Sequence, residues 1–279
     1  MLGLWDSGLG GLTVAGAIAA RMPQLSFLYR ADHAHAPYGA RNRGDILALA
    51  THELDIMFRQ GCNLVIFACN TASVAALRDI QQNWLQKNWP GRNVLGVVVP
   101  VVEALNDTLP DRAVLPAAPT VQIFATDHTV RSQVFITEIY KRAPGLRVMQ
   151  TACPELVPAI ERGAGPDELR TLFNQYIAIA RQNCPAPDYV ILGCTHYALI
   201  KNIFIDAMSG IPILDQPHTL AEKLESYLSR HPEYQMDHSG QHIFTTTGDI
   251  AAVNHAAANY FMQLNLKGEF TALTAMRAA

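Results

Sequence analysis

Short apolar runs alternate with longer amphipathic segments along most of the chain. The apolar runs predict strands, and the segments with apolar residues every three or four positions predict helices. The expected strands are residues 2–5, 26–29, the run before Cys69, 94–99, 121–124, 147–151, the run before Cys194, a short strand near Ile213, and 242–246. The expected helices are residues 12–22, 44–60, 72–84, 129–142, 167–183, 197–208, 219–230 and a closing helix. This alternation predicts an α/β fold with mainly parallel sheets covered on both faces.

Two of the apolar runs resemble each other. LVIFACNTAS (residues 64–73) and YVILGCTHYA (residues 189–198) align so that Cys69 matches Cys194. Each cysteine lies where a buried strand would pass into a helix. Equivalent thiols suggest two similar halves, and a pair of thiols could take a proton from one face of a carbon and return one to the other.

The length of the chain is sufficient for two domains. With 279 residues, two hydrophobic cores of ordinary size are possible. We expect two similar three-layer α/β domains, the first from residues 1–94 and 210–279 and the second from residues 95–209, with the active site in the cleft between them. A loop over residues 106–120, with three prolines, is expected to be irregular surface.

In parallel sheets, ligands bind beyond the carboxyl ends of the strands. Asp6, Cys69, the turn at residues 125–132 and Cys194 all fall at such ends. The glycine-rich turn DSGLGG (residues 6–11) fails the dinucleotide fingerprint, because the sixth position counted from Gly8 is Thr13. Its backbone N–H groups, with Ser7 beside them, would suit a small carboxylate. Asp6 could instead cap the following helix, and both interpretations remain open.

The turn in the other half supplies hydroxyls in the corresponding place. Thr126, Thr129 and Ser132 follow the strand at residues 121–124. Hydroxyls and helix N-termini around two cysteines indicate a pocket for a small anionic zwitterion.

Composition excludes several classes of protein. The net charge of −3 provides no field for nucleic acid or an anionic membrane. The opening MLGLWDSG lacks the basic region of a signal peptide, and the most apolar segment, residues 94–102, is interrupted by Gly96 and Pro100. We therefore expect a soluble, cytosolic protein.

The cysteine pattern argues against disulfides and metal. Five cysteines are an odd number, and no CxxC occurs. Cys62, Cys153 and Cys184 are interpreted as small buried hydrophobes. Cys194 and His196 are two positions apart, which matches no usual zinc spacing, so no metal is expected.

Other chemistries for the cysteines remain conceivable. A hydrolase could use Cys194, His196 and Glu161, although glycines are missing around Cys194 and Cys69 would then be idle. His196 could also be a structural residue packed under a loop. A protein of the same fold that binds amino acids without turnover, or inhibits another protein, is a further alternative.

Five motifs together resemble a known family. DSGLGG (residues 6–11), APYG (36–39), ACNTAS (68–73), LVPAIERG (156–163) and GCTHY (193–197) are similar to the motifs of the glutamate racemases, members of the cofactor-independent aspartate/glutamate racemase superfamily. The likeness runs in the same order from residue 3 to about residue 248, and ACNTAS together with GCTHY is highly specific. The resemblance implies two similar α/β domains with the site between them.

The resemblance also implies the roles of individual residues. Cys69 and Cys194 would be the paired acid/base thiols, with Cys69 acting on D-glutamate and Cys194 on L-glutamate. The implied assisting residues are Asp6, Glu161 and His196, and the implied substrate-binding residues are Asp6, Ser7, Tyr38, Gly39, Asn70, Thr71, Thr195 and His196. No lysine stands in these motifs to hold pyridoxal phosphate, so we expect no cofactor. The implied role is the supply of D-glutamate for peptidoglycan, and we expect a homodimer.

The chain departs from the family pattern at few positions. Ala125 stands where the family usually has glycine, and Ala198 where it usually has proline. Aspartate-selective relatives tend to have glutamate in place of His196 and histidine in place of Ser73, so this chain falls on the glutamate side. A broader-specificity or aspartate racemase of the same superfamily is the remaining alternative.

Overall fold

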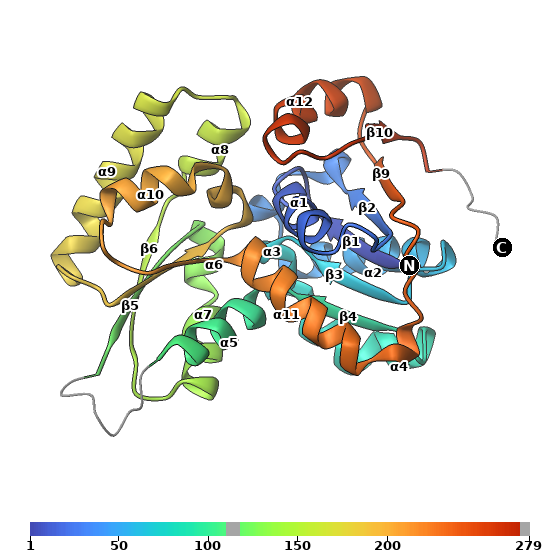
Figure 1. The fold of residues 1–279 in the computed structure, drawn as a ribbon, viewed down its shortest axis with the longest axis horizontal. Helices are drawn as coiled ribbons and strands as arrows, with labels where there is room; N and C mark the ends of the chain where they lie inside the picture. Colours follow the sequence, from blue (N-terminus) through green and yellow to red (C-terminus); the bar gives the residue numbers. More distant parts are fainter. Residues whose placement is uncertain (110–117, 274–279) are drawn as a thin grey trace. The chain divides into compact units, whose positions relative to one another are not determined.

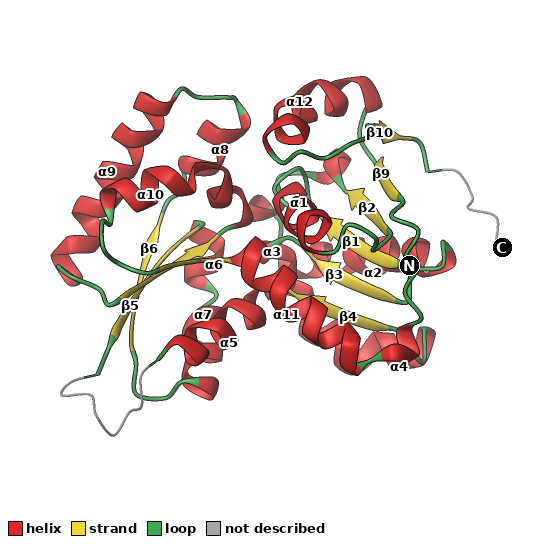
Figure 2. Cartoon of the chain, in the orientation of Figure 1, coloured by secondary structure: helices red, strands yellow, loops and turns green. Residues whose placement is uncertain are grey.

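The computed structural model describes residues 1–109 and 118–273, which fall into two compact units. The first comprises Met1–Val97 and Leu220–Ala279, and the second is Val98–Thr219. Each unit has a parallel sheet with helices packed on it, which confirms the predicted α/β class (Figures 1 and 2). The second boundary lies further along the chain than the predicted position after residue 209, because the strand Ile213–Asp215 pairs with Tyr189–Gly193 in the second unit.

The sheet of the first unit has the strand order β10-β9-β2-β1-β3-β4, and all of its pairings are parallel. Its strands are β1 Leu2–Asp6, β2 Phe27–Ala31, β3 Leu64–Phe67, β4 Asn93–Gly96, β9 His242–Thr246 and β10 Phe270–Thr271. In the centre of the sheet, Leu4 lies opposite Tyr29 on one side and Ile66 on the other. Strands β1, β2 and β3 are buried along their whole length, as expected for parallel strands covered on both faces.

The helical segments that lie wholly or mostly in this unit connect its strands or pack on its sheet. They are α1 Leu12–Arg21, α2 Arg43–Arg59, α3 Asn70–Ala72, α4 Leu85–Asn88, α11 Gln216–Arg230 and α12 Ile250–Gln263, with short helical turns η1 His33–His35, η2 Tyr38–Ala40, η3 Ser73–Leu77, η4 Ile80–Trp84 and η7 Pro232–Tyr234. On one face of the sheet, Trp5 and Phe67 pack with Leu54 and Phe58 of α2. The single helix predicted over residues 72–84 is instead α3 followed by two π-helical turns, a rare form that is frequent near functional sites.

The sheet of the second unit has the order β6-β5-β7-β8, again with parallel pairings. Its strands are β5 Thr120–Ala125, β6 Arg147–Ala152, β7 Tyr189–Gly193 and β8 Ile213–Asp215. Its helices are α5 Val98–Thr108, α6 Asp127–Arg131, α7 Val134–Arg142, α8 Leu156–Glu161, α9 Pro166–Asn183, α10 Lys201–Ala207 and the 3₁₀ turn η6 Thr195–Ile200. Helices α5 and α7 pack on one face of this sheet, while α8, α9 and α10 pack on the other.

Some predicted elements were wrong in extent. The strand expected to reach residue 99 ends at Gly96, and α5 begins at Val98. The β-branched residues at the start of α5 favour a strand by their pattern. Pro100, however, lies in the first turn of α5, where proline is tolerated. The helix expected over residues 129–142 is broken at Gln133, which has φ 57° between α6 and α7. Most of the predicted proline-rich loop, residues 110–117, lies outside the described residues.

The two sheets repeat one arrangement of strands. The order β2-β1-β3-β4 in the first unit matches β6-β5-β7-β8 in the second, so β3 corresponds to β7 and β1 to β5. The equivalence predicted from the two cysteine runs is therefore confirmed at the level of topology.

Candidate active site

Asp6 lies at the end of β1 and organises the glycine-rich turn that follows. Its Oδ2 accepts hydrogen bonds from the N–H groups of Gly8 at 3.3 Å and Gly11 at 2.9 Å, and from the Tyr29 hydroxyl at 3.2 Å. Burial, followed by the nearby charge of Asp6, raises the pKa of Tyr29, so the phenol stays a donor. Two of the N–H groups in this turn, those of Gly8 and Gly11, are thus bonded to the chain's own carboxylate, as expected if Asp6 caps the turn.

Gly11 makes this arrangement possible. A Cβ on Gly11 would lie 2.7 Å from the Cβ of Ala68 and 2.9 Å from the Cβ of Asp6. Only glycine allows α1 to begin this close to the ends of β1 and β3.

Cys69 follows β3 and is the N-cap residue of α3. Its sulfur accepts a hydrogen bond from the Ser7 hydroxyl at 3.2 Å and from the Ala72 N–H at 3.4 Å, and the residue is 8% exposed. The next two residues, Asn70 and Thr71, are buried in the first turn. The Ser7 hydroxyl and the Ala72 N–H are thus placed to donate to negative charge that develops on this sulfur.

The APYG segment (residues 36–39) follows β2, at the carboxyl ends of the strands of the first sheet. Tyr38 is 2% exposed, and its hydroxyl donates to Asp32 Oδ2 over 2.5 Å. Gly39 is exposed, and a Cβ added there would meet no atom within 4 Å. The Tyr38 hydroxyl is therefore occupied within the protein, which leaves the adjoining backbone as the part that can contact a ligand.

Cys194 occupies the equivalent position after β7. It is 7% exposed, and its sulfur lies 3.8 Å from His196 Nδ1. His196 Nε2 lies 3.0 Å from Glu161 Oε1 at the end of α8, and the Glu161 carboxylate is about half exposed. Thr195, between the cysteine and the histidine, is buried. The structure therefore brings together Cys194, His196 and Glu161 as a connected chain of side chains.

The environment of His196 favours the imidazolium. Burial alone would lower its pKa, but the hydrogen bonds and negative charges of Cys194 and Glu161 outweigh burial and raise the pKa to about 10. An imidazolium that faces sulfur at 3.8 Å is a donor that stabilises negative charge on Cys194.

The other three cysteines differ from Cys69 and Cys194 in their position, because none of them directly follows β3 or β7. All five are free thiols. Burial raises the pKa of Cys62 to about 12 and raises the pKa values of Cys153 and Cys184 as well. The interpretation of these three as small buried hydrophobes is confirmed by their burial.

The hydroxyls in the turn after β5 serve the helix that follows. Thr126 Oγ1 accepts from the Thr129 N–H at 3.4 Å and donates to Thr129 Oγ1, and Ser132 Oγ donates to the Thr129 carbonyl at 2.6 Å. These contacts cap and close α6. Thr129 is fully buried, and the role of these hydroxyls around a ligand stays a prediction.

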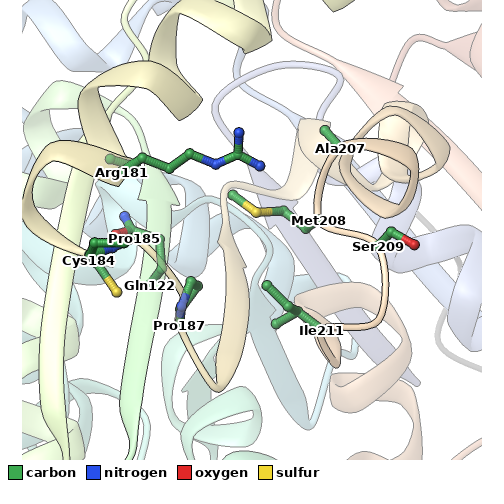
Figure 3. A pocket seen from close by; sticks show the side chains of 10 residues that line it. Gln122, Arg181, Cys184, Pro185, Pro187, Ala207, Met208, Ser209 and Ile211 are labelled. Atoms are coloured by element: carbon green, nitrogen blue, oxygen red, sulfur yellow. The ribbon is translucent and has the colours of Figure 1, made fainter.

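The second unit has a cavity of about 180 Å³ that lies away from the predicted catalytic residues. Gln122, Arg181, Cys184 and Met208 are among the side chains around it (Figure 3). Pro187 and Ile211 in its wall precede β7 and β8, whereas Cys194 follows β7, so the cavity opens at the opposite ends of the strands. No predicted catalytic residue lines it.

Two further properties bear on the class of protein. Within residues 1–109 and 118–273, every helix falls short of the length and apolarity that a bilayer-spanning segment needs. The same residues contain no group of three or more histidine, cysteine or acidic side chains placed to hold a metal ion.

The fold and these side chains define an α/β protein of two units that share an order of four strands, with one buried, hydrogen-bonded thiol after the equivalent strand of each unit. Residues 13–224 match the Asp/Glu/Hydantoin racemase family, and the chain belongs to that family.

Individual relatives agree with this assignment. The chain is 42% identical to a glutamate racemase of Roseobacter denitrificans over 97% of its own length and 99% of the relative's. It is 43% identical to a glutamate racemase of Paracoccus denitrificans, with 93% and 96% of the two chains covered. Among solved structures, glutamate racemase isoform RacE1 from Bacillus anthracis matches its fold with a TM-score of 0.81 at 24% identity, covering 98% and 97% of the chains. A Thermus thermophilus glutamate racemase in complex with β-chloro-D-alanine matches with a TM-score of 0.74 at 28% identity, covering 98% and 96%.

Proposed function

We propose that this protein is a glutamate racemase that interconverts L- and D-glutamate by two-base proton transfer at the α-carbon. The observation that carries the proposal is the pair of thiols, Cys69 and Cys194, each after the equivalent strand of its unit and each within reach of side-chain donors. Relatives named glutamate racemases at 42% and 43% identity support glutamate as the substrate.

The chemistry is difficult because the α-hydrogen of an amino acid is far less acidic than a thiol. One sulfur must act as thiolate and accept the α-proton, while the other, as thiol, donates a proton to the opposite face. The first sulfur ends as thiol and the second as thiolate, so no electrons are lost or gained. Exchange of protons with solvent restores the starting state.

The carbanion formed in this step must be stabilised as well. Its charge spreads into the α-carboxylate, where hydrogen-bond donors have their greatest effect. We assign substrate binding to Asp6, Ser7, Tyr38, Gly39, Asn70, Thr71, Thr195 and His196.

Each thiol has its own assisting groups in this proposal. Cys69 acts on D-glutamate with Asp6 as its assisting residue, and Cys194 acts on L-glutamate with His196 and Glu161 as its assisting residues. The reaction proceeds without a cofactor. Lys201, in the helix after Cys194, is held at 2.6 Å by the buried carboxylate of Asp215.

A second candidate rests on the connected side chains of the second unit. Cys194, His196 and Glu161 have the order of a nucleophile, a base and an orienting acid, as in a cysteine hydrolase. That function would give no role to the Ser7–Cys69 contact. The membership of the chain in a racemase family also favours the first candidate.

The proposed cellular role is the supply of D-glutamate for peptidoglycan in the cytoplasm, by a homodimer. Sedimentation equilibrium of the purified protein tests the assembly. A monomer at micromolar concentration would contradict that part of the proposal alone.

Racemisation in deuterated water tests the mechanism. With two bases, the thiol that donates carries a proton from solvent, so each newly formed enantiomer should contain deuterium from the first turnover, while unreacted substrate stays largely protiated. Chiral chromatography with mass spectrometry separates the two pools. Product that retains the substrate hydrogen early in the reaction would indicate one base, and absence of any racemisation would refute the function.

A further inference from the structure

Asp32 is a buried carboxylate that the proposed chemistry does not use. It follows β2 and is fully buried. Its Oδ1 accepts from His35 Nδ1 at 2.8 Å and from Thr247 Oγ1 at 2.7 Å, and its Oδ2 accepts from the Tyr38 hydroxyl at 2.5 Å. A buried carboxylate is costly unless it is satisfied in this way, so the three donors must be held in place together.

These contacts join segments that are far apart in the sequence. Thr247 follows β9 and lies 215 positions from Asp32. Its hydroxyl also accepts from the Ala34 N–H at 3.1 Å, and its own N–H donates to the Ala31 carbonyl at 3.0 Å. The Asp32 N–H in turn donates to the Asp6 carbonyl at 2.8 Å. The ends of β1, β2 and β9 are thereby fixed around one carboxylate.

The same carboxylate reaches the Cys69 helix through Tyr38. The Tyr38 ring packs edge-on against Trp5, with the ring centroids 5.8 Å apart, and η2 packs against α3, the helix that begins next to Cys69. Burial and the Asp32 carboxylate raise the pKa of Tyr38, so its hydroxyl donates throughout the working pH range.

We propose that Asp32 is a positioning residue for the proton transfer at Cys69, acting through Tyr38 and η2 on the first turn of α3. The inference rests on the proposed function, since Cys69 matters only if it carries the chemistry. A displacement of about 1 Å in a catalytic group costs on the order of 100-fold in rate, so a loosened η2 would be felt at the thiol.

Asp32→Asn tests this with almost no change in size. The amide retains only one carbonyl oxygen, so either Tyr38 or the His35 and Thr247 pair loses its acceptor. We expect kcat/KM for glutamate to fall by about 10-fold or more. The loss should be mainly in kcat, because the substitution disturbs the position of the reacting thiol. The matched control is Asp249→Asn, the N-cap of α12, because asparagine caps a helix as well as aspartate does.

Two readouts are independent of turnover. Alkylation of Cys69 by iodoacetamide, followed by peptide mass spectrometry, reports on the thiolate itself, and hydrogen exchange of the backbone reports on η2 and α3. In Asp32→Asn we expect the alkylation rate of Cys69 to change at least about 3-fold and exchange to increase at both segments, because these respond to the fraction of thiolate and to local opening. Tyr38→Phe, which removes only the hydroxyl, should give the same pattern and serves if Asp32→Asn does not fold.

The outcomes separate the possible failures. Faster exchange with unchanged kcat/KM and unchanged Cys69 alkylation would make Asp32 merely structural and overturn the inference. An equal loss in Asp249→Asn would overturn it as well. If the wild-type protein does not racemise glutamate at all, the proposed function fails, while alkylation and exchange still decide whether Asp32 acts on Cys69.

Discussion

The Ser7 hydroxyl donates a hydrogen bond to the sulfur of Cys69 over 3.2 Å. The corresponding support for Cys194 comes from an imidazole, at 3.8 Å. The two thiols are thus held by different chemistry, a neutral hydroxyl on one side and a histidine with a raised pKa on the other. Substitutions should therefore affect the two sides differently with pH.

Ser7→Ala removes the hydroxyl donor to Cys69. A hydrogen bond to a charged group contributes about 1.5–3 kcal/mol, so kcat/KM for glutamate should fall by roughly 10- to 100-fold. Steady-state racemisation followed by circular dichroism measures this. Ser209→Ala, in the second unit beside the cavity of Figure 3, is the control and should behave as wild type. A Ser7→Ala enzyme with unaltered kcat/KM would mean that the 3.2 Å contact has no part in catalysis.

Cys69→Ser and Cys194→Ser should each abolish racemisation in both directions. Every turnover needs one thiol as base and the other as acid, and a serine hydroxyl is too weak an acid to replace either. Chiral chromatography from pure L- and pure D-glutamate is the measurement. Cys184→Ser is the matched control, since this buried thiol lies at the opposite ends of the strands. Near-wild-type rates in either catalytic variant would rule out the two-thiol mechanism.

Local signals predicted most of the fold. Residues 242–246 were expected as a strand and form β9 with the same bounds, and the two cysteine runs occupy equivalent strands. The apolar pattern does not predict helix α8, within the LVPAIERG motif, because the helix is short and Pro158 lies in its first turn. Such an element is recognised only from the way it packs against α9.

The support around the thiols was harder to predict than the thiols themselves. The sequence is compatible with Asp6 as a cap or as a functional residue, and in the structure its carboxylate binds two N–H groups of its own turn. The sequence does not indicate a role for Asp32, because its partner Thr247 is 215 positions away and no spacing rule connects them. The signal that could have found it is an aspartate at the end of a buried strand, the position already noted for Asp6.

Asp215→Asn should destabilise the protein at neutral pH. Burial alone would raise the pKa of Asp215, but hydrogen bonds from His218 and Lys201 lower it from 3.8 to about 2. A carboxylate whose pKa is lower in the folded than in the unfolded chain stabilises the fold at pH values above its unfolded pKa of 3.8. This stabilisation is lost as pH falls through about 2. The shift corresponds to about 2 kcal/mol, measurable by urea unfolding at pH 7.

The control for this prediction is Asp206→Asn, an exposed carboxylate at the end of α10. Its unfolding free energy should change by no more than about 0.5 kcal/mol. If Asp215→Asn were as stable as wild type at pH 7, the two 2.6 Å contacts of Asp215 would contribute nothing to stability.

Glutamate should be preferred over aspartate by at least ~10-fold in kcat/KM, because a misplaced buried carboxylate leaves polar groups unpaired. Initial rates with both amino acids in deuterated water, read as deuterium uptake at the α-carbon, give the ratio. Comparable rates on aspartate would place the protein among racemases of broader specificity.

The alkaline limb of the pH profile should report His196. A histidine with a raised pKa is protonated below it, so the imidazolium that faces Cys194 persists through pH 7–9 and is lost as pH rises through about 10. The contribution of this imidazolium to the stability of the fold is complete below the ordinary pKa of 6.5 and is lost as pH rises from there through about 10.

Glu161→Gln removes the negative charge next to His196 Nε2 and therefore lowers the pKa of His196. This should move the alkaline limb of kcat/KM down by about one pH unit. Because Glu161 is half exposed, a larger shift is not expected. Glu168→Gln, another exposed glutamate on a neighbouring helix, should leave the limb in place. A limb that is the same in Glu161→Gln and wild type would assign the alkaline ionisation to a group other than His196.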